Sequence, residues 1–140
     1  AGLKADLESL VDTFKNAGAK RALVLDMSVA SHCELLESAV ENLKPYLIEF
    51  LNEEFSNVVS NVSANLYSTK DEAVELLASQ LISPVKYKQS IKAFDDKVDL
   101  FIEFGHGAVL KGLNRKISDK PTLNVSDIKT LNETLEVLND

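Results

Sequence analysis

Histidine is the residue type in this 140-residue chain best suited to proton transfer near neutral pH, and the chain has two. His32 stands in the stretch SVASHCELL, between an apolar run and an amphipathic one. Cys33 follows it, but adjacent side chains on a helix point about 100° apart, so a cysteine–histidine pair is disfavoured. No G-x-S-x-G elbow supplies a serine nucleophile. His32 is thus a candidate general base, and a structural role at the start of a helix is the alternative.

The second histidine, His106, lies in a Gly-x-Gly turn between a strand pattern and a helix pattern. The N–H groups that open a helix attract phosphate, so such a turn can bind nucleotides. Here Gly105, Gly107 and Gly112 form GxGxxxxG instead of the dinucleotide pattern GxGxxG, and GxxxxGK[ST] does not occur. We interpret the stretch as a tight structural turn.

Helix and strand patterns alternate along the chain, which predicts an α/β fold. Helices are expected over residues 3–17, 31–50, 68–83, 84–97 and 108–117 and from 126 onward, and strands near 22–28, 55–59, 100–104 and 122–125. Ser31 and Glu34 fit a capping box, which would put His32 in the first turn of a helix. There the positive end of the helix dipole would keep the imidazole neutral. Pro45 should kink or restart that helix.

Composition narrows the function classes. An apolar content of 45% fits one ordinary folded domain, and 15 basic against 22 acidic residues give a net charge of -7. That charge disfavours nucleic acid and anionic membranes as partners. With a single cysteine the chain is not expected to form an internal disulfide, and without a cluster of residues at metal-ligand spacing it is not expected to bind a metal. Without a signal peptide or a long apolar run, a cytoplasmic location is expected.

Four stretches carry a resemblance to a known family: AGAKRALVLDMSVASHCELL, VVSNVSANLY, QLISPVKYKQSI and FIEFGHGAVLKGLNRKI. In this order and spacing they resemble the malonyl-CoA:acyl carrier protein transacylases of bacterial fatty acid synthesis. The resemblance implies the C-terminal part of an α/β-hydrolase-like acyltransferase domain. Residues 1–31 would be the last helix and strand of a ferredoxin-like subdomain, and residues 32–140 would belong to the large subdomain.

The resemblance also implies roles for three residues. His32 would be the catalytic histidine, acting as general base for a serine nucleophile. The backbone carbonyl of Gln80 would orient its ring, and Asn61 would line the substrate cleft. The implied reaction moves malonyl from malonyl-CoA to the serine and then to the phosphopantetheine thiol of acyl carrier protein, with no cofactor beyond these substrates.

The family's serine motif GHSxGE, its oxyanion-hole glutamine and its malonyl-binding arginine precede these stretches and do not occur in the 140 residues. The resemblance therefore predicts a truncated chain, a proteolytic fragment or one piece of a split enzyme, with the missing N-terminal portion as partner. Alone it should be inactive and should associate through uncovered strand edges and apolar faces.

Two alternatives stay open at this point. The chain could be a non-catalytic remnant used for binding, or an acyltransferase for methylmalonyl or another acyl group. Ala-Ser-His, here Ala30 to His32, also occurs in methylmalonyl-selecting polyketide relatives, although those usually have tyrosine at the position of Val29. His106 departs from the family's usual proline in a Gly-Pro-Gly turn.

Carrier proteins are acidic, so a docking surface for one should be basic. The candidate docking residues are Lys20, Arg21, Lys111, Arg115 and Lys116.

Overall fold

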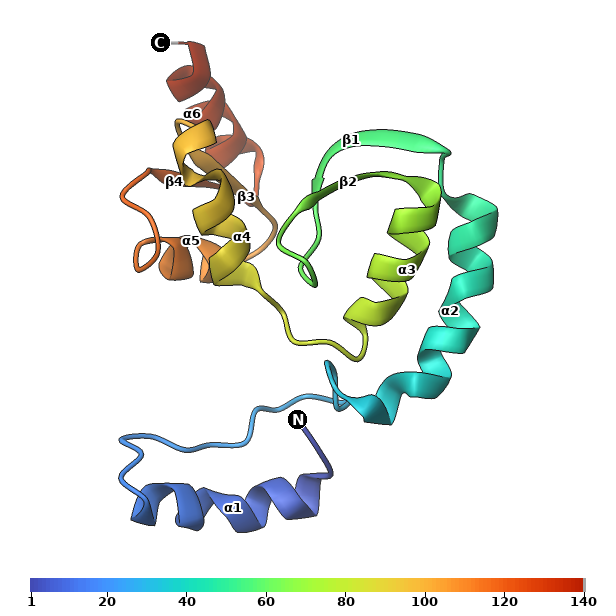
Figure 1. Cartoon of the computed structure of the whole chain (residues 1–140). Coiled ribbons are helices and arrows are strands. Elements are labelled where there is room, and N and C mark those ends of the chain that lie inside the picture. Colours follow the sequence, from blue (N-terminus) through green and yellow to red (C-terminus); the bar gives the residue numbers. More distant parts are fainter. Residues whose placement is uncertain (140) are drawn as a thin grey trace. The chain divides into compact units, whose positions relative to one another are not determined.

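The computed structural model describes residues 1–139 and has the mixed α/β fold that the sequence predicts (Figure 1). The chain forms two compact units, residues 1–86 and residues 87 onward, each described separately below. The sequence-based division at residue 31 stays a prediction. None of the helices in residues 1–139 is both long and apolar enough to cross a membrane.

The first unit contains an antiparallel hairpin with two helices packed beside it. Its elements are α1 (Lys4–Asn16), the short 3-10 helix η1 (Glu34–Leu36), α2 (Glu37–Phe50), β1 (Glu54–Val59), β2 (Leu66–Thr69) and α3 (Lys70–Gln80). β1 pairs with β2, and α3 packs against both β2 and α2. The buried apolar residues of the described chain all lie in the hairpin and α3: Ala64, Tyr67, Ala73, Val74 and Ala78.

The second unit is built on a parallel strand pair. Its elements are α4 (Tyr87–Phe94), the 3-10 helix η2 (Asp95–Lys97), β3 (Phe101–Phe104), α5 (Val109–Asn114), β4 (Thr122–Val125) and α6 (Ile128–Asn139). β3 and β4 run parallel, with Phe101 opposite Thr122 and Phe104 opposite Val125. Parallel neighbours need a crossover, and α5 lies in the connection between them. Both strands fall where the sequence predicts them.

A partly buried chain of polar side chains joins three elements of the second unit. The Tyr87 hydroxyl donates to Asn114 Oδ1 at 2.8 Å, and Asn114 Nδ2 donates to Thr122 Oγ1 at 3.1 Å. Asn114 is only 2% exposed. Burial raises the pKa of Tyr87, and the charge of Glu103 raises it further, so the phenol stays protonated and able to donate.

The predicted strand near residues 22–28 is absent. A strand exists only where its N–H and C=O groups pair with a neighbour, and no described strand pairs with this stretch. Local turns form instead, with Met27 N–H donating to Leu25 O and Ser31 N–H donating to Val29 O. Residues 22–28 therefore have the composition of a strand, but no described strand pairs with them.

The predicted helix boundaries around His32 are also wrong. Ser31 does not cap a helix, because Cys33 is the N-cap of η1 and no side chain bonds to that end. A capping box does form at Thr69 and Glu72, one residue after the predicted start of a helix at residue 68. α2 continues unbroken through Pro45.

The helix predicted from Pro84 begins at Tyr87. Lys86 N–H donates to Asn61 O at 2.8 Å, so the segment before Tyr87 bonds to the hairpin loop and does not enter a helix. The second hairpin strand, β2, was not predicted.

Asn114→Ala should destabilise the second unit by about 2 kcal/mol, because it leaves Tyr87 and Thr122 without their buried partner. Thermal and urea unfolding of the 140-residue chain would measure the change. Asn132→Ala, at an exposed position on α6, is the matched control and should change stability by less than about 0.5 kcal/mol. Equal effects of the two substitutions would contradict a structural role for the polar chain.

Candidate active site

His32 is fixed by two hydrogen bonds to the C-terminal end of α3. Its Nδ1 lies 2.9 Å from the backbone oxygen of Gln80, and its backbone N–H donates to Leu81 O, also at 2.9 Å. A carbonyl oxygen can only accept, so Nδ1 carries the proton and donates it. In the neutral ring Nε2 is then left with a free lone pair. The ring is therefore held in the tautomer that a general base requires.

Both acceptors are backbone carbonyls at the C-terminal end of α3. The last C=O groups of an α-helix have no intrahelical partner, and Gln80 and Leu81 are the final residue and the C-cap of α3. The capping pattern predicted the ring at the positive N-terminal end of a helix, and this was wrong. The ring bonds instead to the carbonyl end of α3, which carries negative partial charge.

The backbone at His32 adopts a left-handed conformation, with φ of 63°. This conformation costs a residue with a Cβ on the order of 1–2 kcal/mol, so it persists only where surrounding bonds impose it. The two bonds to α3 supply that constraint. They also explain why Ser31 and Glu34 form no capping box, because the chain turns at His32 before the helix can begin.

α3 is itself anchored at its other end. The Thr69 hydroxyl accepts from Glu72 N–H at 3.4 Å, and Glu72 Oε2 accepts from the backbone N–H groups of Ser68 and Thr69. Hydrogen bonds from Ser68 and Thr69 lower the pKa of Glu72. Lys44 on α2 pairs with Glu75 on α3 at 3.1 Å. The helix that holds His32 is thus fixed against both the hairpin and α2.

Asn61 lies in the loop between β1 and β2 and is half-buried. The Ser60 hydroxyl shapes this loop by accepting from the N–H groups of Val62 and Ser63 at 3.0 and 3.3 Å. The Asn61 carbonyl accepts from Lys86 N–H. These contacts involve only its backbone, so its suggested role toward substrate stays a prediction.

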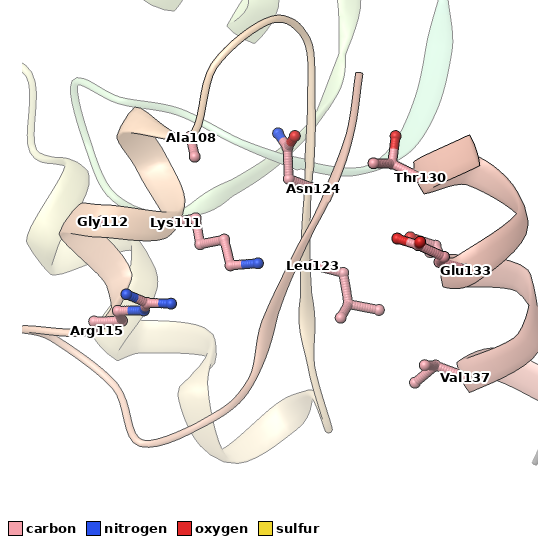
Figure 2. Close-up of a pocket in the computed structure, with 10 residues that line it drawn as sticks. Ala108, Lys111, Gly112, Arg115, Leu123, Asn124, Thr130, Glu133 and Val137 are labelled. Carbon is pink, nitrogen blue, oxygen red and sulfur yellow. The ribbon is translucent and has the colours of Figure 1, made fainter. Parts of the chain in front are cut away.

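The five basic candidates fall into both units. Lys20 and Arg21 are exposed in the segment after α1. Lys111 and Arg115 line a groove between α5 and α6 (Figure 2), whereas Lys116 does not line it. Docking by all five stays a prediction.

The Gly-His-Gly turn is closed by an internal carboxylate. Gly105 and Gly107 have φ of 133° and 84°, which only glycine adopts easily. Glu103 at the end of β3 accepts from the N–H groups of Leu110 and Lys111, each at 3.0 Å. Its carboxylate occupies the place that a phosphate would take at the start of α5. The turn is therefore structural, as the glycine spacing indicated.

Comparison with known proteins gives a consistent set of relatives. The chain is 36% identical over 143 residues to the malonyl CoA-acyl carrier protein transacylase of Bacillus subtilis and 37% identical over 141 residues to that of Haemophilus influenzae. These alignments cover 100% and 99% of the chain but 45% of each relative. No family model matches the chain.

Solved structures agree with these relatives. The crystal structure of the transacylase from Helicobacter pylori matches 99% of the chain with a TM-score of 0.92 and 45% identity. A malonyl-transacylase in complex with a type II polyketide synthase acyl-carrier protein matches 97% of it with a TM-score of 0.88 and 33% identity. In both cases the match covers 45% of the solved chain.

The chain has the mixed α/β fold of these solved transacylases. It is a relative of the malonyl CoA-acyl carrier protein transacylases and corresponds to their C-terminal part, so the resemblance seen in the sequence is confirmed. The chain spans about half the length of the relatives it matches.

Stability should depend on pH through Glu72. Its pKa is lowered in the folded chain, so its contribution is present above the unfolded pKa and is lost as the pH falls from about 5 toward 3. Glu72→Gln should flatten this part of the stability profile, measured by urea unfolding at each pH. Asp71→Asn removes a neighbouring first-turn carboxylate and should leave most of the slope; an equal loss would contradict the role of the capping box.

Gln80→Ala should leave His32 in place, because the contact uses the backbone of residue 80. Nitrogen-15 NMR of the neutral ring should find the proton on Nδ1 in the parent chain and in Gln80→Ala alike. A proton on Nε2 in the parent chain, or a change of tautomer in the variant, would contradict the geometry.

Proposed function

We propose that this chain supplies the general base of a malonyltransferase that moves malonyl from malonyl-CoA to the phosphopantetheine thiol of acyl carrier protein, in fatty acid synthesis in the cytoplasm. The observation that carries the proposal is the bond from His32 Nδ1–H to Gln80 O at 2.9 Å, which leaves Nε2 free to accept a proton. The names of the relatives support the reaction class and the substrates.

The proposed chemistry has two half-reactions through a serine in a GHSxGE segment outside these 140 residues. His32 Nε2 takes the serine proton while the serine oxygen attacks the thioester carbonyl. The tetrahedral intermediate collapses, and the departing CoA sulfur receives the proton from the imidazolium. In the second half His32 takes the proton of the phosphopantetheine thiol, whose sulfur attacks the malonyl-serine ester, and the proton returns to the serine oxygen. Neither half-reaction needs a metal or a further cofactor.

In both half-reactions the Gln80 carbonyl would take the role that the aspartate carboxylate has in a serine–histidine–aspartate triad. It holds the tautomer and orientation of the ring and stabilises the imidazolium by accepting its Nδ1–H. Asn61 would line the cleft for the acyl group. Malonyl is the substrate that the relatives' names support, and methylmalonyl is the alternative that a substrate assay would detect.

We assign docking of the acidic carrier protein to basic residues, and the candidates are Lys20 and Arg21 in the first unit and, in the second, Lys111 on α5 with Arg115 and Lys116 after it. One related structure, the malonyl-transacylase in complex with an acyl-carrier protein, supports this class of partner. In the chain taken alone, we expect no transfer, because the nucleophile is supplied elsewhere.

His32→Ala should lower malonyl loading of the serine by about 100-fold or more, the size of a general-base contribution. The assay combines the 140-residue chain with a polypeptide carrying the GHSxGE portion and measures malonyl transferred from labelled malonyl-CoA. His106→Ala is the matched control, because this histidine is exposed in the turn before α5 and should change loading by less than about twofold.

Unchanged loading in His32→Ala would exclude the proposed base. Reconstituted parent protein that transfers no acyl group, although the parts associate, would favour the non-catalytic binding remnant. Circular dichroism of both variants would separate loss of chemistry from loss of folding.

A further inference from the structure

The end of α3 determines which backbone carbonyls are available to His32. The last turn of the helix closes with Leu81 N–H donating to Ala78 O at 3.3 Å. Two residues further along, the carbonyl of Gln80 lies 2.9 Å from the ring nitrogen of His32. Among residues 1–139 no backbone N–H donates to this carbonyl. It can accept from the histidine because the chain does not use it in a helix.

The residue that would supply the helical donor is a proline. In an α-helix each carbonyl accepts from the N–H four positions later, so the donor to Gln80 O would be residue 84. Pro84 has no N–H, and in a continued helix its ring would clash with the carbonyl of Gln80. Proline also disfavours helical geometry at the residue before it, here Ser83. All three effects keep the Gln80 carbonyl out of a longer helix.

A second contact directs the chain away from the helix. Residues 81–86 form turns and irregular structure after α3 (Figure 1). At the far end of this segment Lys86 N–H donates to Asn61 O at 2.8 Å, in the loop between β1 and β2. Ser60 holds that loop, since its hydroxyl accepts from two backbone N–H groups and the residue is only 4% exposed. The segment is therefore bonded to His32 at one end and to the hairpin loop at the other.

We propose that Pro84 is a positioning residue, which reserves the carbonyl of Gln80 for His32 and so fixes the tautomer of the ring. Pro84 is exposed, so its contribution does not come from filling the core. It removes a donor from the place where a helix would put one. This role rests on the proposed function, because it matters to transfer only if His32 is the base. The tautomer itself can be measured in the 140-residue chain without any transfer.

Pro84→Ala restores an N–H four residues after Gln80 and removes the clash that stops the helix, so a longer helix would compete for the carbonyl. Nitrogen-15 NMR of the 140-residue chain should find the proton of neutral His32 on Nδ1 in the parent chain and distributed over both ring nitrogens in Pro84→Ala. In the assay with the GHSxGE portion, kcat for malonyl loading should fall by about tenfold, the effect of one hydrogen bond to a charged ring. KM for malonyl-CoA should change by less than about twofold, because the bond acts on the chemical step.

Two further variants separate competition for the carbonyl from a change in chain stiffness. Pro84→Gly restores the same N–H, but glycine is a poorer helix former than alanine and makes the segment more flexible. Pro84→Gly should therefore shift the tautomer less than Pro84→Ala does. Pro45→Ala is the matched control, because it makes the same replacement in α2, which already continues through Pro45. It should leave the tautomer unchanged and alter loading by less than about twofold.

Three outcomes would overturn the proposal. A proton that stays on Nδ1 in Pro84→Ala would mean that the carbonyl is kept for His32 without the proline. A larger effect of Pro84→Gly than of Pro84→Ala would assign Pro84 to the stiffness of the segment. An equal effect of Pro45→Ala would assign the change to general destabilisation. Circular dichroism and thermal unfolding of each variant verify that the chain is still folded.

The two measurements also separate this proposal from the proposed function. A changed tautomer with unchanged loading would support the role of Pro84 at the ring and would count against His32 as the base. A changed tautomer together with a lower kcat would support both.

Discussion

The arrangement of the candidate active site depends on the hydrogen bonds that join His32 to the end of α3. Residues 32 and 80 are 48 positions apart, so the bond is a tertiary contact and not a local turn. Because the acceptor is a backbone carbonyl, it does not ionise at any pH. An aspartate in the same place would lose its charge in acid and release the ring. The carbonyl fixes the tautomer without adding a second titrating group to the site.

The position of that carbonyl is set by how α3 packs. Ala73 and Ala78 are completely buried, and their small side chains let the helix lie close to its neighbours. The Thr69 and Glu72 capping box joins the start of α3 directly to the end of β2. The edge-on contact of Phe55 with Tyr67, 5.5 Å between ring centres, ties the two strands of the hairpin together. The hairpin therefore positions the histidine through α3, whose last carbonyls bond to it.

The sequence predicts elements well where the physical cause is local. Residues 100–104 are a short, mainly apolar run, residues 122–125 are a short stretch with Leu123 and Val125 at alternate positions, and both contain strands. Residues 22–28 have the same composition but no strand beside them, and pairing is a tertiary event that composition does not encode. β2 joins an Asn- and Ser-rich loop directly to Thr69, the N-cap of α3, so its four residues carry the signals of a loop and of a helix start. Ser31 and Thr69 both match the capping pattern, and only the fold decides between them.

Prediction from sequence is limited in the same way for the residues of the candidate active site. His32 could be singled out by residue type, because few side chains accept protons near neutral pH. Gln80 could not, since its contribution is a carbonyl that every residue possesses. Its role was suggested only by the resemblance to a family. Every residue has a backbone carbonyl, so the sequence does not indicate which carbonyl takes part in a site. Such sites have to be found from the geometry of the structure.

The two ends of α5 illustrate how charge decides where an anion can bind. A glycine turn before a helix suggests a phosphate site at the helix start. In this chain the carboxylate of Glu103 already accepts hydrogen bonds from the N–H groups of Leu110 and Lys111 there. The positive potential of that end is thereby neutralised within the chain. Among residues 1–139, Lys111 within α5 and Arg115 directly after it form no ion pair with a carboxylate.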